Sequence, residues 1–409
     1  MVTPAAVAVA PAVPLAVNEP PVESRGRLDS VDLLRGVIMV VMALDHVRDS
    51  FTRSAHLFDP ADLSRTTTGL FLTRWITHFC APTFIFLAGA SAFLYGSRPG
   101  RSRSELARFL LSRGLWLVLI ELTVVRFAWF FNLDYHFFNL QVIWAIGWSM
   151  VALSALVYLP IRVVGVLGVA MILLHNLADG ITVQPLISAP GVLAPARAWD
   201  WVWSILHVRN TPVTYPLIPW IGVMAAGYAF APVLRHEPAR RRRELVWLGT
   251  ALIAGFVLLR GLNLYGDASR WSMQPSTTFT LLSFINTTKY PPSLLFLLMT
   301  LGPAIVSLTL FERVRGPVAR FFVVYGRVPF LYYVLHLYLI HALVVAFAAV
   351  RGDELQGYLT LWRYLPDSWG YGLGVTYLVW VAVVLALYPI CRWFAGVKSR
   401  RRDAWLSYL

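Results

Sequence analysis

The chain has 409 residues, of which 58% are hydrophobic and only 14% are charged. Globular proteins carry about 25% charged residues, so this composition excludes an ordinary soluble domain and indicates a multi-pass membrane protein. The net charge of +14 does not indicate a nucleic-acid-binding protein, because the basic residues stand in short runs between apolar stretches.

The sequence predicts an all-α helix bundle with about ten membrane spans and a short tail at each end. Residues 1–26 are rich in Ala, Val and Pro and predict a disordered cytoplasmic tail, because prolines interrupt the stretch and no basic segment marks a signal peptide. Residues 27–395 are expected to form the transmembrane domain, and 396–409 a basic cytoplasmic tail. The predicted spans cover 31–51, 70–95, 109–131, 138–159, 162–178, 213–234, 245–265, 292–311, 318–348 and 371–392.

The distribution of positive charge predicts how the bundle lies in the membrane. With the N-terminus inside, 23 of the 35 lysines and arginines fall in inner tails, inner loops and inner span ends. Cytoplasmic segments of membrane proteins carry such an excess. We therefore expect a protein of the cell (inner) membrane with both termini in the cytoplasm.

The longest loops lie on the expected outer side. They cover about 52–69, 179–212, 266–291 and 349–370, and the last contains Trp362 and Trp369. Their content of Pro, Trp and Tyr predicts an outward-facing binding surface, where tryptophans would stack on the faces of a sugar. Anchoring of aromatic residues at the membrane interface is the alternative explanation.

The first span carries an unusual set of ionisable residues. The stretch from Arg35 to Asp49 reads RGVIMVVMALDHVRD and ends in a cluster of charges. Charged residues inside a span usually face a protein interior or a water-filled cavity. Arg35 and His46 are eleven residues apart, which places both on one helix face, separated by about 16 Å along the axis.

Ionisable residues in later spans extend this pattern. The ninth span opens with Tyr325-Gly326-Arg327-Val328-Pro329, where we expect a break or kink. His336 follows at a depth comparable to that of His46, and Lys289 stands at the outer end of the eighth span. Glu121 in the third span is either a proton carrier or an ion-pair partner of an arginine.

These residues together predict a tunnel with a basic inner mouth and a histidine near its outer end. A basic mouth suits an anionic, phosphate-bearing donor. His46 would act as general base or acyl carrier, with Asp45 or Asp49 orienting its imidazole. The predicted donor-binding residues are Arg35, Arg113 and Arg327. The predicted acceptor-binding residues are Lys289, His336 and Arg48.

Plainer explanations stand beside these predictions. A membrane histidine is often only a structural hydrogen-bonding group, and basic clusters such as Arg98–Arg113 are mostly topology signals. Cys80 and Cys391 are expected to be buried apolar residues rather than a disulfide or metal ligands. The sequence contains no zinc signature, so no metal site is predicted.

Stretches from Arg27 to the end of the ninth span match a known pattern. They read RLDSVDLLRGVIMVVMALDHVRDSF, FCAPTFIFLAGASAFLYG, RGLWLVLIE, NLQVIWAIGWSM, YPLIPWIGVMAAGY, NTTKYPPSLLFLLMTLGP and GRVPFLYYVLHLYLIH. With these stretches the chain resembles the bacterial branch of the heparan-alpha-glucosaminide N-acetyltransferase catalytic-domain family. Its first span also resembles the acyltransferase-three superfamily, in which an Arg or Lys, ten residues and a catalytic His form a signature. Arg35 and His46 match that spacing.

The resemblance implies a bundle of ten or eleven helices around a tunnel. It also implies an enzyme that moves an acetyl or other acyl group from a cytoplasmic thioester, with acetyl-CoA as donor, to an acceptor across the membrane. The large lumenal domain of lysosomal relatives is not expected in this sequence, so a heparan-derived amino sugar is not carried over as acceptor. The paired-arginine motif of the third span is also incomplete, because Ser112 and Leu110 stand where a partner of Arg113 is expected.

We therefore expect an acetyl-CoA-dependent O- or N-acyltransferase that uses an outer-side acceptor such as a sugar. Its partners would be acyl-CoA, the acceptor and membrane lipids, without nucleic acid. The competing hypothesis is a proton-coupled transporter, or a flippase for an anionic lipid or glycan precursor, with His46 and Glu121 as proton relays. The absence of a visible internal repeat disfavours that hypothesis.

Overall fold

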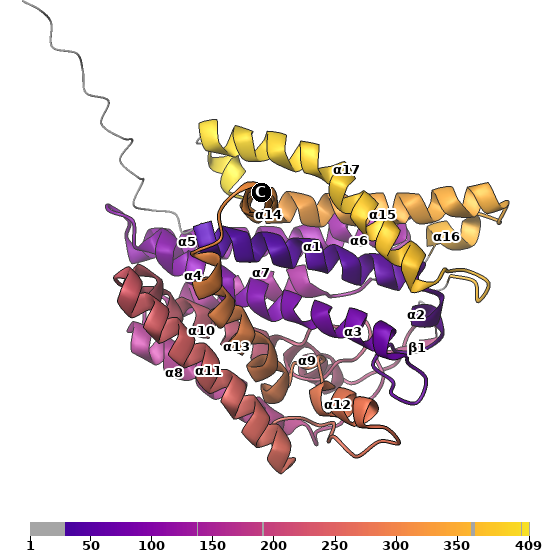
Figure 1. The fold of residues 1–409 in the computed structure, drawn as a ribbon, viewed down its shortest axis with the longest axis horizontal. Coiled ribbons are helices and arrows are strands. Elements are labelled where there is room, and N and C mark those ends of the chain that lie inside the picture. Colours follow the sequence, from indigo (N-terminus) through magenta and orange to yellow (C-terminus); the bar gives the residue numbers. More distant parts are fainter. Residues whose placement is uncertain (1–28, 137, 190–191, 361–364, 402, 409) are drawn as a thin grey trace, which may run out of the picture.

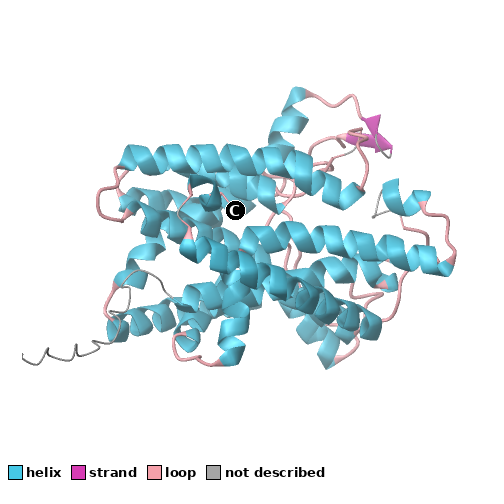
Figure 2. Cartoon of the chain, turned by 90° about the horizontal axis from the view of Figure 1, so that it is seen from above, coloured by secondary structure: helices cyan, strands magenta, loops and turns pink. Residues whose placement is uncertain are grey.

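A computed structural model describes residues 29–408 except 137, 190–191, 361–364 and 402. The tail predicted over 1–26 and Trp362 lie outside the described residues. The described chain is almost entirely helical, and its strands are the antiparallel pair β1 (Ile187–Ala189) and β2 (Val192–Leu193) at one corner of the molecule (Figures 1 and 2). The all-α membrane class predicted from the sequence is thereby confirmed.

Each predicted span coincides with a helical run. In chain order these runs are α1 (Asp29–Phe51), α3 (Thr68–Ile76) with α4 (Cys80–Gly96), α5 (Arg103–Ile120) with α6 (Arg126–Phe130), α7 (Val142–Leu156), α8 (Ile161–Leu174), α10 (Leu217–Phe230), α11 (Pro238–Leu262), α13 (Leu294–Phe311), α14 (Pro317–Arg327) with α15 (Pro329–Arg351), and α17 (Leu373–Arg400). Short helices lie in the loops: α2 (Arg53–Leu57), α9 (Ala198–Leu206), α12 (Thr277–Ile285) and α16 (Gln356–Thr360).

Seven helical segments of the described chain are long and apolar enough to cross a membrane. They are Thr68–Gly96, Ile161–Ala178, Leu217–Arg235, Pro238–Leu262, Leu294–Phe311, Pro329–Arg351 and Leu373–Arg400. The helices of the other three predicted spans are too short, too charged or too irregular to be among these seven segments. The α1 helix carries six charged residues, α5 runs into a π-helical turn at Glu121–Val125, and α7 has only 15 residues.

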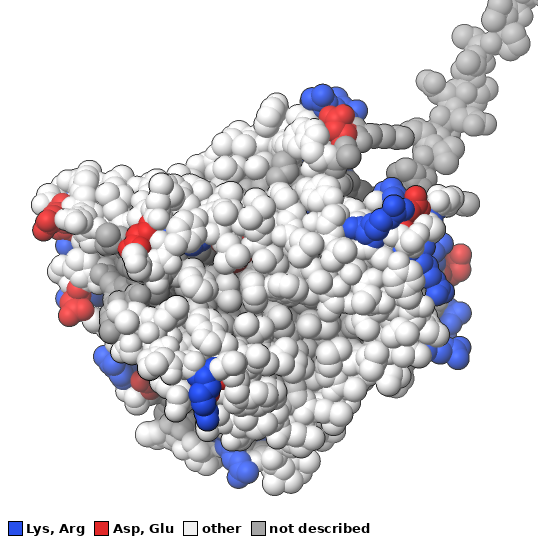
Figure 3. All heavy atoms as spheres, turned by 180° about the vertical axis from the view of Figure 1, so that it is seen from behind, with Lys and Arg blue, Asp and Glu red and all other residues white. Residues whose placement is uncertain are grey.

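The bundle has two ends, which we name from α1. The near face is the end where α1 begins at Asp29, and the far face is the end where α1 finishes at Phe51 (Figure 1). The far face carries the long connections 52–67, 179–216, 263–293 and 352–372. Figure 3 shows charged side chains gathered toward the ends of the molecule, with much of the surface between them free of charge. Such an uncharged band is what a lipid bilayer requires.

The α1 helix lies inside the bundle. It packs against α4, α13, α14, α15 and α17, and 16 of its 23 residues are buried. Its charged side chains therefore face protein groups instead of lipid, which is why a helix this polar is tolerated. By contrast, only 17% of the residues in the apolar stretch that includes α8 are buried inside the protein, and only 22% of those in the apolar stretch of α11. These two helices therefore lie at the periphery of the bundle.

Paired glycines mark the crossings of five helix pairs in the described chain. The pairs are Gly36 with Gly326 (α1 and α14), Gly89 with Gly227 (α4 and α10), Gly114 with Gly147 (α5 and α7), Gly168 with Gly222 (α8 and α10), and Gly249 with Gly302 (α11 and α13). The same five pairs make the most extensive helix–helix contacts. Without side chains at the crossing, two backbones approach closely and gain van der Waals contact, which drives helix association in lipid.

The predicted break in the ninth span is confirmed. The α14 helix ends at Arg327 and α15 starts at Pro329, whose ring cannot continue the preceding helix. Two other expectations need correction. The α17 helix continues to Arg400, so the boundary expected between 395 and 396 falls inside it. Trp369 is fully buried and donates a hydrogen bond to the Ser50 carbonyl at 2.7 Å, so it is not a sugar-stacking surface.

Candidate functional site

One cavity of about 1040 Å³ is lined by residues from both faces of the bundle. Its near-face lining includes Arg35, Arg98, Arg113, Arg327 and Lys398. Its middle is lined by apolar and aromatic residues of α1, α4, α5, α7 and α15. Its far-face lining includes Asp45, His46, Arg74, Lys289 and Tyr290. The three predicted donor residues therefore border the same space as two of the predicted acceptor residues, Lys289 and Arg48. The third, His336, is fully buried and does not line the cavity.

His46 lines the far half of this cavity and contacts His336 behind it. His46 Nδ1 and His336 Nε2 are 2.7 Å apart, although 290 residues separate them in the chain. His336 is fully buried, whereas His46 is half-buried and lines the cavity. The Trp129 ring packs edge-on against the His46 imidazole, with centroids 5.1 Å apart. The comparable depth predicted for the two histidines thus becomes a direct contact.

The second nitrogen of His336 fixes the protonation pattern of the pair. His336 Nδ1 lies 2.8 Å from the Tyr332 carbonyl oxygen. Because a carbonyl can only accept, Nδ1 carries the hydrogen, and Nε2 of a neutral His336 is then an acceptor. His46 must donate from Nδ1 to that acceptor, so its Nε2 keeps a lone pair. A histidine held in one tautomer is ready to act as base or nucleophile at the other nitrogen.

Asp45 takes part in an ion-pair network and does not hydrogen-bond the His46 imidazole in the described chain. Its Oδ1 lies 2.7 Å from Arg48 Nη1 and 3.0 Å from Arg74 Nη1. The Thr77 hydroxyl donates to the same oxygen at 2.6 Å, and Lys289 Nζ lies 3.8 Å from Oδ2. Asp45 therefore neutralises cations from three parts of the chain.

Arg48 and Asp49 complete this network. The Arg48 side chain is 1% exposed, and its Nη2 lies 2.5 Å from Asp49 Oδ1. Among the described residues neither Asp45 nor Asp49 hydrogen-bonds the His46 ring, so the structure shows no hydrogen bond for the orienting role predicted for them. His336 occupies that position. Arg48, predicted to bind the acceptor, pairs with both carboxylates and also lines the cavity.

The near-face mouth joins the arginines predicted to bind the donor. Arg35 Nη1 and Arg327 Nε lie 3.6 Å and 4.0 Å from the Asp32 carboxylate. Arg35 also donates to the Leu87 carbonyl at 3.1 Å and to the Ser91 hydroxyl, which ties α1 to α4. Arg113 lines the same mouth from α5. The result is a basic rim in which one carboxylate positions two guanidinium groups.

The far-face mouth carries Lys289, Tyr290 and Arg74. Lys289 is 7% exposed and lies over the Tyr290 ring at 5.2 Å. Burial by itself would raise the pKa of the Tyr290 hydroxyl, but Lys289 and Arg74 outweigh it and hold that pKa below its ordinary value. Arg209 approaches the other side of the mouth, 4.8 Å from the Tyr290 ring. This end can offer several hydrogen-bond donors to a polar acceptor.

Some residues of the site were not predicted. Arg74 stands in an otherwise apolar stretch, and the argument applied to Arg35 would have selected it. Lys398 lies in the helix end that was expected to be a tail. Tyr333 lines the cavity near His46, and its hydroxyl is buried without a hydrogen-bond partner in the described chain. No sequence signal distinguishes Tyr333 from its neighbour Tyr332.

Glu121 lies beside the start of α7 and lacks the arginine partner considered for it among the described residues. It is 1% exposed, and one carboxylate oxygen accepts the Gln141 backbone N–H at 3.3 Å. Gln141 precedes the first residue of α7, so Glu121 satisfies the unpaired N–H groups of that helix start. No arginine pairs with it among the described residues.

Comparison with known proteins adds one finding. Residues 27–265 match the protein family described as "Heparan-alpha-glucosaminide N-acetyltransferase, catalytic". No curated protein matches the chain. The matched segment covers more than half of the 409 residues and includes His46, whereas His336 lies beyond it. The family's name is that of a transferase, which suggests transferase activity for a membrane protein with these apolar helices. The chain therefore belongs to the heparan-alpha-glucosaminide N-acetyltransferase catalytic family.

Proposed function

We propose that the chain is a transmembrane acyltransferase of the cell (inner) membrane. It takes an acetyl group from acetyl-CoA at the near face, which is cytoplasmic together with both termini, and passes it to a sugar acceptor at the far face. The observation that carries this proposal is that His46, held by buried His336, lines a cavity whose lining reaches both faces.

The near-face mouth suits a coenzyme A thioester. Its basic rim of Arg35, Arg113 and Arg327 offers charge-assisted hydrogen bonds to phosphate groups. The axial distance from Arg35 to His46 is about 16 Å along the helix. The arm of the coenzyme would occupy the apolar middle of the cavity and present the thioester carbonyl to His46.

The chemistry then needs a base at His46. Nε2 takes the proton of the acceptor hydroxyl or amine while the acceptor's oxygen or nitrogen attacks the thioester carbonyl. The carbon–sulfur bond breaks, coenzyme A leaves as the thiolate, and that thiolate recovers the proton from His46. His336 supports the imidazolium that forms in between, because its Nε2 accepts a hydrogen bond from Nδ1 of His46.

Tyr333 is placed to help the same step. The thioester oxygen becomes negative when the carbonyl is attacked, and a donor aimed at it lowers the barrier. The Tyr333 ring centroid lies 6.2 Å from that of His46. Because its hydroxyl is buried and lacks a partner within the described residues, it is available to donate to the developing oxyanion.

The acceptor would lie among the far-face donors. Lys289, Arg74 and Tyr290 surround the end of the cavity beyond His46. Hydroxyl-rich acceptors are recognised by such converging donors and by a carboxylate acceptor such as Asp45. The ion pairs of Asp45 hold these groups in place before the acceptor arrives.

Acetyl transfer by the purified full-length protein tests the proposal. The protein in detergent would receive radiolabelled acetyl-CoA and a panel of sugars and amino sugars, and labelled product would be measured. We expect His46→Ala to lower turnover by about 100-fold or more. His236→Gln is the matched control, because His236 pairs with Glu244 away from the cavity. Equal turnover by His46→Ala and the parent protein would refute the proposal.

A further inference from the structure

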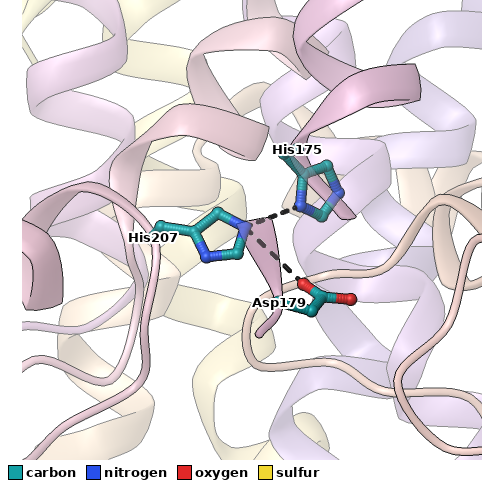
Figure 4. Close-up of side chains that lie close together, drawn as sticks. All are labelled: His175, Asp179 and His207. Atoms are coloured by element: carbon teal, nitrogen blue, oxygen red, sulfur yellow. Dashed lines mark hydrogen bonds and ion pairs between the residues drawn. The ribbon is translucent and has the colours of Figure 1, made fainter. Parts of the chain in front are cut away.

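A second cluster of ionisable side chains lies outside the cavity, at the far end of α8. It consists of His175 in the 3₁₀ turn that ends α8, Asp179 directly after that turn, and His207 directly after α9 (Figure 4). One nitrogen from each histidine and one carboxylate oxygen lie within 4.8 Å of one another. None of the three residues borders the cavity described above.

The separations inside the cluster match those around one metal ion. His175 Nδ1 and His207 Nε2 are 3.2 Å apart, and His207 Nε2 and Asp179 Oδ1 are 3.7 Å apart. Ligand atoms bound tetrahedrally to one zinc ion at about 2.0–2.1 Å stand about 3.4 Å from each other. Figure 4 shows the three side chains turned toward one another, with dashed lines from His207 Nε2 to His175 Nδ1 and to Asp179 Oδ1.

Hydrogen bonding within the cluster does not account for this convergence. A neutral histidine pair explains the 3.2 Å contact, but the 3.7 Å separation from Asp179 is too long for a hydrogen bond. The outer nitrogens, Nε2 of His175 and Nδ1 of His207, are buried without a hydrogen-bond partner in the described chain. The three inner atoms are His175 Nδ1, His207 Nε2 and Asp179 Oδ1. A metal ion would bind all three at once, because each can give it an electron pair.

The surroundings hold the three side chains in place. The Asn176 side-chain amide donates from Nδ2 to Asp179 Oδ2 at 2.8 Å. Its Oδ1 accepts the Leu294 backbone N–H at 2.9 Å. His207 is 1% exposed and stacks on Trp203, with ring centroids 5.3 Å apart. Outer contacts of this kind orient metal ligands and tune their affinity.

The ligand set indicates the kind of ion. Two imidazoles and one carboxylate suit Zn²⁺ and related divalent transition metals, whereas Mg²⁺ and Ca²⁺ prefer oxygen ligands and Cu(I) prefers sulfur. Three protein ligands leave a fourth position for water. We propose that His175, Asp179 and His207 form a site for a divalent transition-metal ion, with Zn²⁺ as the ion expected first.

A metal ion at this site would hold the chain segments beside the far-face mouth in fixed positions. It joins the end of α8 to the chain that follows α9, where Arg209 stands two residues after His207 and contacts the Tyr290 ring. A bound ion therefore fixes the stretch that supplies Arg209 to the mouth. This inference does not depend on the proposed acyl transfer, because it concerns a separate set of residues.

Metal titration of the full-length protein tests the site. The protein would be purified with a histidine-free tag, treated with a chelator and titrated with Zn²⁺. We expect about one equivalent to bind, with affinity lowered at least about 10-fold in His207→Gln and in Asp179→Asn. His136→Gln is the matched control, because exposed His136 also pairs with an aspartate, Asp134, but has no second histidine beside it. Absence of binding, or equal binding by all variants, would overturn the proposal.

A second measurement covers variants that fail to fold. Co²⁺ added to the chelator-treated parent protein reports its coordination through visible absorption. An intense spectrum typical of four-coordinate cobalt, removed by competing Zn²⁺, is expected. Weak absorption typical of six-coordinate aqueous cobalt would overturn the site. Zn²⁺ should also raise the melting temperature of the parent protein and of His136→Gln alike.

Discussion

At the scale of single residues, the site depends on which nitrogen of His46 carries the hydrogen. The Tyr332 carbonyl decides this through His336, since each contact permits only one direction of donation. The result is a lone pair at His46 Nε2. His336 is a positioning residue in this arrangement, because it acts through His46 and need not touch the substrate.

Replacing His336 should affect the chemical step, measured by kcat, and leave acetyl-CoA binding, measured by KM, nearly unchanged. We expect His336→Ala to lower kcat by about 10- to 100-fold while KM for acetyl-CoA changes little, because the His46 tautomer is lost and the donor mouth is untouched. His336→Gln should recover part of the loss, since its amide oxygen can accept from His46 Nδ1. Steady-state kinetics of both variants check this. A rise in KM with unchanged kcat would contradict the role.

Tyr333 allows a more conservative test. Tyr333→Phe removes one hydroxyl and keeps the ring that packs beside His46. We expect kcat to fall by about 10-fold or more, because a donor to the developing oxyanion disappears. Tyr338→Phe is the matched control on the same helix, since that hydroxyl is bound to the Val124 carbonyl at 3.0 Å. Equal losses in the two variants would argue against an oxyanion role for Tyr333.

The sequence predicted the members of this site better than their partners. Counting residues along two helices was enough to place His46 and His336 at similar depth. It assigned Asp49 to the imidazole because residues three apart on a helix can touch, and Asp45 because it adjoins His46 in the sequence. Two competing partners of Asp45, Arg74 and Lys289, come from other parts of the chain, and local spacing carries no information about them.

At the scale of elements, the crossing of α1 and α14 holds the donor mouth together. A Cβ atom at Gly36 would lie 1.8 Å from the Phe322 carbonyl oxygen, and one at Gly326 would lie 1.8 Å from that of Asp32. The two backbones therefore touch where Arg35 and Arg327 share Asp32. The break before Pro329 lets α14 make this crossing at its own angle and leaves α15 to carry His336.

Gly36→Ala should disturb this crossing. The added methyl group cannot fit unless α1 and α14 separate, so we expect a lower melting temperature and a raised KM for acetyl-CoA. The control is Gly261→Ala in α11, because a Cβ atom there meets no atom within 4 Å. Thermal unfolding in detergent compares the two. Similar melting temperatures for both variants would contradict the packing described here.

The elements were predicted from apolar length, and that signal has a known limit. It found the helical run of each predicted span, and the break at Gly326 to Pro329, because proline and charge act locally. It did not find the short helices α2, α9, α12 and α16, which lie in the predicted loops. It could not show that the second span contains a 3₁₀ turn at Thr77–Phe79 or that the third contains a π-helical turn. Those irregularities depend on packing between helices, as does the approach of His207 to His175 from the 179–216 connection.

At the scale of the whole molecule, the cavity joins a basic near face to a donor-rich far face. The sequence predicted this polarity from the distribution of arginines and the lengths of the loops. The continuity of the cavity could not be predicted, because it depends on how side chains of α1, α4, α5, α7 and α15 leave space between them. A path through the bundle is what separates transfer across a membrane from chemistry at one surface.

The near-face rim should control donor binding alone. Arg113→Ala is expected to raise KM for acetyl-CoA about 10-fold with little change in kcat, because a charge-assisted contact to phosphate is worth about 1.5–3 kcal/mol. Arg108→Ala is the control, since Arg108 is exposed on the same helix and does not line the cavity. Kinetics at several salt concentrations check this. A fall in kcat at unchanged KM would place Arg113 in another role.

Transfer across a sealed membrane tests the central claim most directly. The purified protein would be placed in vesicles with labelled acetyl-CoA outside and an accepted sugar trapped inside, with the orientation determined by protease access to the C-terminus. We predict labelled sugar inside vesicles whose protein has its near face outward, and none with His46→Ala. Labelled sugar formed only when donor and acceptor share one side, or formed equally by His46→Ala, would contradict the account.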